Sequence, residues 1–365
     1  ISFNKKMYWR QHNDEFILFR ENPSWYQNFH ETNIFGLDIN AIQKIKSGTN
    51  VIGIEIRSDN IISNVLGDDL ENPIMIDSNN FYFKGASRTT TNIFAERNMK
   101  LSNMSISTGV MVNIDSKYGN EYFPGIDISY NIDDNLKIFA SHNKSMRSPN
   151  YTELFYISPT NQGNSNLKPE RSINKEIGVK WHTNTHSSSF TYYQRKGNNM
   201  IDWILFNGDS IWRTQNLSKL KTIGYELNSR ININKLLNSN IPISSLSINY
   251  SVNETDTTSE GFQSAYVLDH LKTKFSLIAT QNICNNIRID WRMSYQDREG
   301  EYTNFETGLE MEYLPFWLVS ARFSYKMFNN ILFLEINNLM NNEYVDFGNI
   351  PQPGRWMRAG IKFIL

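Results

Sequence analysis

The sequence predicts an all-β protein, a transmembrane antiparallel β-barrel of about 16 strands. Three observations lead to this expectation. Apolar and polar residues alternate along most segments, short connections alternate with long ones, and no run approaches the roughly 18 apolar residues of a membrane-spanning helix. Because a period of two places neighbouring side chains on opposite faces of a strand, the alternation indicates strands. We expect residues 1–365 to form one barrel domain, with no second domain.

Two segments near the C-terminus show the alternation most clearly. From 287 to 296 every odd residue is apolar or aromatic and every even residue is polar, and residues 317–327 repeat the pattern with Leu318 as the one exception. The face opposite the apolar one carries many charges, and in a barrel of this size such residues line a wide polar interior. Examples of these charged residues are Glu176, Lys180, Glu226, Arg230, Lys272, Lys274, Arg288 and Arg292.

The connections alternate in length along the whole chain. Short turns are expected near residues 46–49, 98–101, 133–135, 184–186, 234–241, 283–286 and 328–330. Longer connections are expected near 21–28, 59–80, 145–171, 197–212, 253–265, 297–314 and 339–354, with a short one near 117–120. Bacterial barrels have short periplasmic turns and longer extracellular loops, which this rhythm matches. A turn at 12–14 would add a seventeenth strand.

A large soluble β-sandwich or β-helix would also alternate. Many of the expected strands run past ten residues, whereas strands of soluble proteins usually have about five or six. Loop lengths that follow a strict alternation have no reason to occur in a sandwich. The barrel is therefore the favoured architecture.

Composition excludes several classes of function. The chain has 36 basic and 37 acidic residues, so no nucleic-acid partner is predicted. Its single cysteine, Cys284, excludes an internal disulfide and lies in a polar turn, far from any histidine in sequence. Aromatic residues make up 13% of the chain, which suits the interfacial girdles of a barrel.

An outer-membrane enzyme is a further alternative, and it would need a catalytic cluster at one rim. The six histidines are scattered, and His182 and His186 flank an expected turn. We predict no enzyme activity, no catalytic residue, no metal ligand and no cofactor. The histidines are His12, His30, His142, His182, His186 and His270.

Two long motifs go beyond architecture. The first runs from Arg147-Ser148-Pro149 through Glu153-Leu154-Phe155 to Leu167-Lys168-Pro169-Glu170. Proline ends the strand, because it lacks the N–H donor and pushes the preceding residue out of ladder geometry. The second runs from Asn337 to Tyr344 and on through Pro351 to Arg355. Together they closely resemble the mid-barrel signature and the last loop of TonB-dependent outer-membrane receptors. The alternating last strand fits too, although Leu365 stands where an aromatic residue is usual.

The resemblance implies a location in the bacterial outer membrane and active uptake of a scarce, bulky nutrient. Barrels of this family have about 22 strands and are closed by a plug domain, so we expect this chain to be the C-terminal part of such a barrel, without the plug. The implied partners are outer-membrane lipid, a small-molecule ligand, the TonB complex through the missing plug region, and a surface lipoprotein. A looser resemblance of residues 16–32 and 53–67 to cobalamin-receptor-like members of Bacteroidetes type suggests vitamin B12 (cobalamin), with a ferric siderophore as the other candidate; either would be cargo.

The resemblance places ligand binding in the extracellular loops. Aromatic faces can pack against a corrin or a catecholate, so the loop aromatics are the candidate contacts. They are Trp25, Tyr26, Tyr156, Trp203, Phe206, Trp212, Tyr302, Phe305 and Phe347. A passive 16-stranded porin is the main alternative, since the strand count alone favours it. Against it stand the two motifs and the lack of a long, acid-rich constriction loop facing basic strands.

Overall fold

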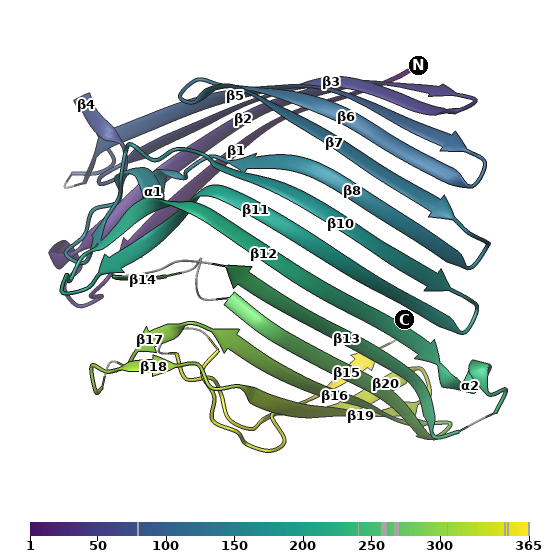
Figure 1. Ribbon diagram of the computed structural model, residues 1–365. Helices are drawn as coiled ribbons and strands as arrows, with labels where there is room; N and C mark the ends of the chain where they lie inside the picture. Colours follow the sequence, from purple (N-terminus) through teal and green to yellow (C-terminus); the bar gives the residue numbers. More distant parts are fainter. Residues whose placement is uncertain are drawn as a thin grey trace.

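The computed structural model is almost entirely β-structure. It describes residues 1–78, 80–239, 241–256, 261–265, 270–304, 306–346, 348 and 350–363. One sheet contains nineteen strands, and sixteen of these follow one another as an antiparallel meander that curls around a central space (Figure 1). The expectation of about 16 strands is therefore confirmed.

The meander strands vary from 8 to 21 residues. In order they are β1 (Ser2–Ile17), β2 (Gln27–Ile45), β3 (Gly48–Ser63), β5 (Phe81–Leu101), β6 (Met104–Asp115), β7 (Gly119–Asn131), β8 (Leu136–Arg147), β10 (Glu170–His182), β11 (His186–Phe206), β12 (Trp212–Asn232), β13 (Ile243–Asp256), β15 (His270–Cys284), β16 (Ile287–Glu299), β19 (Phe316–Met327), β20 (Asn330–Asn337) and β21 (Trp356–Phe363). The short strands β4 (Asp68–Met75), β9 (Asn161–Gln162) and β14 (Phe262–Ser264) extend the sheet, and β17 (Glu301–Thr303) pairs with β18 (Glu310–Glu312).

Helical structure among the described residues is confined to connections. The pieces are η1 (Pro23–Trp25), α1 (Tyr151–Phe155) and α2 (Ile233–Leu236). No described helix has the length and hydrophobicity needed to cross a membrane.

The two edge strands of the meander do not meet. Among the described residues β1 pairs only with β2, and β21 pairs only with β20. An unpaired edge in lipid leaves backbone N–H and C=O groups without partners, which is costly. The sheet described here is thus an open wall, as expected for part of a larger barrel.

The two ends of the wall differ in the length of their connections, as the sequence predicted. Short turns join β2 to β3, β7 to β8, β10 to β11, β15 to β16 and β19 to β20, close to the predicted positions. Helix α2 begins at the predicted turn at 234–241 and ends at Leu236. We call this the turn end, and the opposite end, where the longer connections gather, the loop end (Figure 1).

Three boundary predictions were wrong. The turn expected at 98–101 lies at 102–103, where Ser102 has a positive φ of 49°. The turn considered at 12–14 is absent, since β1 pairs with β2 without a break. The long loop expected at 197–212 is instead a ribbon: β11 and β12 stay paired as far as Ile204 and Arg213, and only 207–211 connect them.

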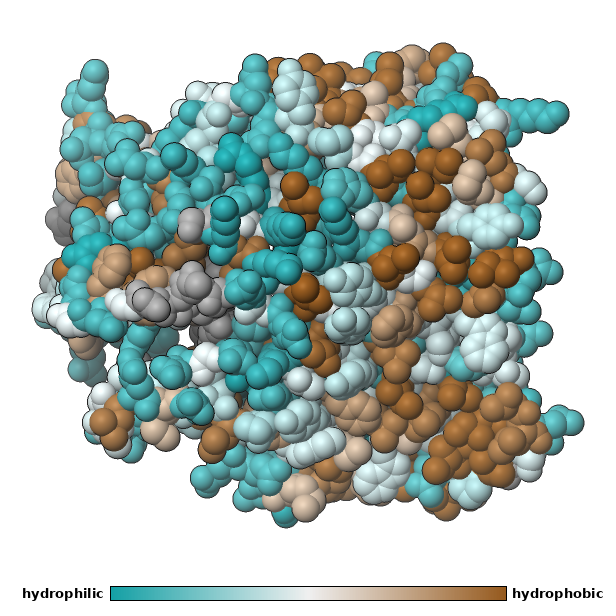
Figure 2. Space-filling model, in the orientation of Figure 1, coloured by the Kyte–Doolittle hydropathy of each residue, from teal (hydrophilic) through white to brown (hydrophobic). Residues whose placement is uncertain are grey.

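The outer face of the wall carries the apolar residues. Large apolar side chains are exposed on it, including Met7 (85%), Ile52 (61%) and Ile177 (58%). In Figure 2 hydrophobic side chains gather over the half nearer the turn end, and hydrophilic ones cover the loop end. This division suits a wall whose half near the turn end faces lipid and whose loop end faces water.

On the inner face, aromatic rings lie over glycines of the neighbouring strand. The directly opposed pairs are Tyr8–Gly36, Phe94–Gly53, Phe139–Gly178, Tyr193–Gly224 and Phe333–Gly360. Such pairs cover exposed glycine backbone and help to fix strand register.

A Gly178→Ala substitution tests this arrangement. The added methyl group would stand 2.5 Å from Cζ of Phe139 and 2.6 Å from the backbone oxygen of Phe190. Since the backbone cannot yield as a side chain can, we expect a loss of about 1–3 kcal/mol in the free energy of unfolding, measured by urea unfolding. Gly125→Ala is the control, because its methyl group meets only the movable side chain of Asn143; equal stability of the two variants would contradict the argument.

Candidate functional site

The connection between β8 and β10 forms a rigid bridge at the loop end. β8 ends at Arg147, and Pro149 follows where the ladder stops. A reciprocal cap then starts α1: Asn150 Oδ1 accepts from the Glu153 N–H at 2.7 Å, and Glu153 Oε2 accepts from the Asn150 N–H at 2.8 Å.

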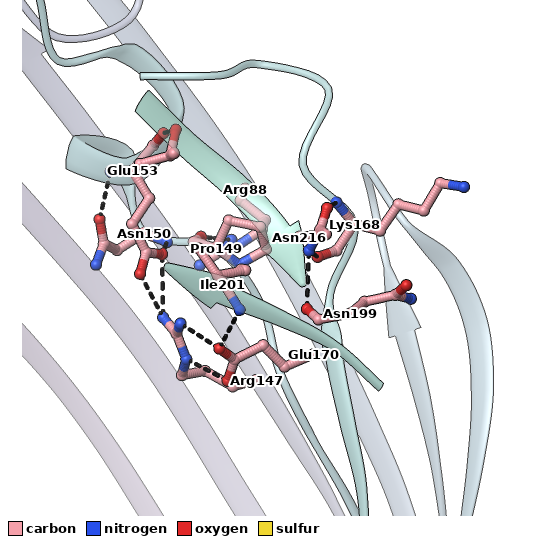
Figure 3. A network of polar contacts seen from close by, with 11 residues as sticks. Arg88, Arg147, Pro149, Asn150, Glu153, Lys168, Glu170, Asn199, Ile201 and Asn216 are labelled. Atoms are coloured by element: carbon pink, nitrogen blue, oxygen red, sulfur yellow. Dashed lines mark hydrogen bonds and ion pairs between the residues drawn. The ribbon is translucent and has the colours of Figure 1, made fainter. Parts of the chain in front are cut away.

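Arg147 joins two carboxylates of this bridge (Figure 3). Its Nη1 lies 3.0 Å from both oxygens of Glu153, and its Nε and Nη2 donate to Glu170 at 2.7 Å. Glu170 also accepts from the Ile201 N–H at 2.8 Å. Both carboxylate side chains are only 12% exposed, so the bidentate contacts are shielded from water. The group ties β8, α1, β10 and β11 together.

Strands on two sides hold α1. From β5, Arg88 donates through Nη1 to the Pro149 carbonyl at 2.8 Å. From β12, the buried Thr214 donates through Oγ1 to the Glu153 carbonyl at 2.8 Å. Arg88 lies on the face of β5 that also carries Asn92, the polar inner face. The bridge is therefore anchored against the inner side of the wall.

The second half of the first motif is clamped by one side chain. Asn216 accepts from the Lys168 N–H at 2.8 Å and donates to the carbonyls of Lys168, at 2.9 Å, and Asn199, at 2.8 Å (Figure 3). Beneath the bridge, Leu154, Leu167 and Ile201 form a small buried apolar cluster. The motif residues thus position a loop rather than present groups to a ligand.

Three of the predicted aromatic residues meet beside this bridge. The hydroxyls of Tyr26 and Tyr156 lie 2.8 Å apart, and Asn28 Nδ2 donates to Tyr26 at 3.3 Å. The Tyr156 ring stands edge-on to Trp203 with centroids 6.5 Å apart. We call Tyr26, Tyr156 and Trp203 the aromatic cluster; it joins the β1–β2 connection, the bridge and β11.

The other predicted aromatics lie elsewhere at the loop end. Trp25, 59% exposed, packs edge-on against Phe19, and Phe206, 42% exposed, packs against Phe262. The Trp212 N–H donates to Thr160, so its backbone holds the bridge. Tyr302 of β17 packs against Tyr313 with tilted rings, away from the cluster, and Phe305 and Phe347 lie outside the described residues.

A pocket of about 640 Å³ lies between α1 and strands β3 and β5. Arg88 and Lys117 supply positive charge to it, Asp68 supplies one negative charge, and Tyr151 and Phe155 supply aromatic rings. The Lys117 ammonium lies 5.5 Å from the Phe155 ring centroid, and burial lowers the pKa of Lys117. Cations and aromatic faces thus stand together at the loop end.

The family model for "TonB dependent receptor-like, beta-barrel" matches residues 3–339. The chain belongs to the TonB-dependent receptors. Membership places the receptor in the bacterial outer membrane, with its turn end periplasmic and its loop end extracellular. It gives no support to the porin alternative.

Curated relatives of this receptor are named as transporters and receptors rather than enzymes. "Vitamin B12 transporter BtuB" of Photobacterium profundum is 26% identical over 143 residues, which cover 38% of this chain and 23% of that protein. "Ferrienterobactin receptor" of Escherichia coli is 29% identical over 126 residues, covering 30% of this chain and 17% of that protein. The alignments thus span about a fifth of each relative.

Solved structures share the fold of the receptor. The ferric enterobactin receptor of Pseudomonas aeruginosa superposes with a TM-score of 0.72 at 14% identity, covering 98% of this chain and 59% of that one. The siderophore receptor PirA of Acinetobacter baumannii gives a TM-score of 0.69 at 16% identity, covering 93% and 55%. The chain therefore spans somewhat more than half of these receptors.

In the receptor's aromatic cluster, the ionisation of Tyr156 is expected to depend on its buried surroundings, which a pH titration can test. Burial, and after it the hydrogen bond with Tyr26, raises the pKa of Tyr156 from 10.0 to about 12. Because the folded state favours the neutral phenol, this contribution to loop stability is complete below pH 10 and is lost as the pH rises towards 12. Phenolate absorbance, compared between wild type and Tyr156→Phe, should show a tyrosine that ionises near pH 12.

The Tyr26→Phe variant serves as the control for this titration. It removes the hydrogen bond but not the burial, so Tyr156 should ionise earlier than in the wild type and still above pH 10. Ionisation of Tyr156 near pH 10 in the wild type would contradict the assignment.

Proposed function

We propose that this barrel forms the wall of a receptor that takes up cobalamin or a ferric siderophore across the outer membrane, driven by the TonB complex. The names of the relatives support this choice of cargo, since they include vitamin B12 transporters and siderophore receptors. We further infer that the protein transports its cargo without transforming it.

The observation that carries the proposal is the aromatic cluster beside the rigid bridge. Tyr26, Tyr156 and Trp203 come from three separate parts of the chain and meet at the extracellular end. Aromatic faces bury flat apolar rings with little loss of conformational entropy, and their polar edges can bind amide or catechol groups. In the adjacent pocket the cations Arg88 and Lys117 outnumber the one carboxylate, Asp68, so the pocket would favour an anionic chelate.

Uptake by a strain that lacks the native receptor gene tests the proposal. The strain should lose accumulation of either radiolabelled cyanocobalamin or radiolabelled ferric enterobactin, and the restored full-length gene should recover it. A protonophore should abolish accumulation and leave binding to whole cells intact, because energy is needed only for transport. If accumulation of both compounds is unchanged by the deletion, the proposed cargo is wrong.

Single-channel conductance separates this function from passive diffusion. A receptor closed by a plug should give no steady open channel in a planar bilayer. A constant open conductance from the full-length protein would contradict active uptake.

A further inference from the structure

A polar row crosses the outer face of the wall near the turn end. Gln43, Asn50, Arg97 and Thr108 lie directly opposite one another on β2, β3, β5 and β6. Arg97 donates to Asn50 Oδ1 at 2.6 Å and to Ser47 Oγ at 3.0 Å, and Asn50 donates to Gln43 Oε1 at 3.0 Å. The side chains therefore hold the guanidinium in a fixed place on the outer surface.

Apolar rows lie on both sides of this polar row. Two residues further along each strand, on the same face, the row towards the loop end is Ala41, Ile52, Ala95 and Val110. The row towards the turns is Ile45, Gly48, Met99 and Ile106. Ile52 is 61% exposed and Val110 is 43% exposed, so this face looks outwards to lipid. Arg97 thus interrupts a lipid-facing apolar surface.

A charged side chain on the lipid-facing surface, such as that of Arg97, costs free energy. An arginine on the lipid face costs about 2–4 kcal/mol at the midplane of the bilayer and about 0–1 kcal/mol near its interfaces. On the outer face two residues, Met99 and Leu101, lie between Arg97 and the turn after β5. The Arg97 guanidinium also donates to Ser47 in the turn between β2 and β3, so it lies near the turn end and its periplasmic interface. In the described part of the chain no carboxylate forms an ion pair with it. A guanidinium carries five N–H donors and binds phosphate well.

A hollow adjoins the guanidinium on the same face. Its volume is about 620 Å³, and its lining includes Ala41, Ile52, Ala95, Val110 and Arg97. The small side chains of Ala41 and Ala95, on either side of Ile52, leave the wall recessed. A volume in the range of about 300–1,000 Å³ accepts a small organic ligand rather than a single water molecule.

We propose that this hollow binds one phospholipid of the inner leaflet, with its phosphate on Arg97 and part of an acyl chain over Ala41 and Ala95. The charge of the head group complements the guanidinium, and the apolar recess matches the chain. The periplasmic depth of Arg97 selects the inner leaflet, where phospholipid phosphates lie. The site is separate from the loop end and does not depend on the cargo.

Native mass spectrometry of the full-length receptor in detergent tests the site, with dioleoylphosphatidylglycerol as the probe. We expect one lipid molecule to bind more tightly than the rest. Arg97→Gln should weaken it about tenfold or more, as for loss of a charge-assisted hydrogen bond. Ala95→Phe, which fills the recess, should also weaken it, whereas Arg97→Lys should retain part of the affinity. Dioleoylglycerol, which lacks the phosphate, should bind weakly to the wild type.

Arg230→Gln is the matched control, because Arg230 lies near the turn end on the charged inner face. It should bind the lipid as the wild type does. Slower migration of heated than of unheated samples on gels verifies that each variant is folded. Equal lipid affinity of Arg97→Gln and wild type would overturn the proposal. So would equal binding of dioleoylglycerol, or a receptor dimer that Arg97→Gln dissociates, since the face would then be covered by a second copy.

Discussion

The Arg147→Ala variant is expected to release the bridge between β8 and β10. The substitution leaves the carboxylates of Glu153 and Glu170 shielded from water without their shared cation. Losing charged hydrogen bonds of this kind costs about 2–4 kcal/mol of local stability. Hydrogen-exchange mass spectrometry should show faster exchange for peptides from 148–169, while peptides from the turn end keep their protection. Ligand affinity should fall with it, because Tyr156 is part of the bridge.

Arg195→Ala provides the comparison for this experiment. Arg195 lies on β11 in an exposed position and donates one hydrogen bond, to Asn174 at 3.0 Å. Its loss should change exchange in 148–169 very little. If peptides from 148–169 exchange amide hydrogens at the same rate in the Arg195→Ala and Arg147→Ala variants, the paired carboxylates do not hold the bridge.

The Trp203→Ala variant is expected to lower ligand affinity about tenfold or more, as for a central aromatic contact. Trp203 packs on Tyr156, and its removal opens one side of the aromatic cluster. Binding of cyanocobalamin and of ferric enterobactin to the purified full-length receptor measures the effect. The β11–β12 ladder should remain intact, because the substitution removes no backbone hydrogen bond.

Trp181→Ala is the matched control for Trp203→Ala. Trp181 lies at the turn end of β10 and packs against His186, far along the wall from the cluster. It should leave affinity unchanged. If the Trp203→Ala variant binds the ligand with wild-type affinity, the aromatic cluster is not part of the binding site.

The architecture could be predicted from the sequence because a strand's faces are encoded locally. Alternation along β16 and β19 requires no knowledge of distant contacts. The errors arose where turn-favouring residues stand inside ladders. Asn98 suggested a turn, yet it pairs with Ser107 while its side chain donates to Glu96. Gly197 suggested a loop, yet it lies opposite Leu220 in the ribbon. Cross-strand pairing outweighs local turn preference at such positions.

The candidate site could be predicted only in part. The sequence identified the aromatic residues, but nothing local indicates that Tyr26, Tyr156 and Trp203 come together. Tyr26 and Tyr156 belong to different connections, and Trp203 belongs to strand β11. The residues of neighbouring strands that anchor the bridge were missed. Thr214 and Asn216 are ordinary polar residues of a strand, and no motif marks them. Their role depends on a register that only the folded wall defines.

The β11–β12 ribbon has a practical consequence. Its strands remain paired to Ile204 and Arg213, and the exposed connection at 207–211 stands at its tip. A fluorophore or affinity tag joined at Asn207 would be carried outside the cell on a stiff stalk. Such a reporter would count receptors on living cells and follow their lateral diffusion.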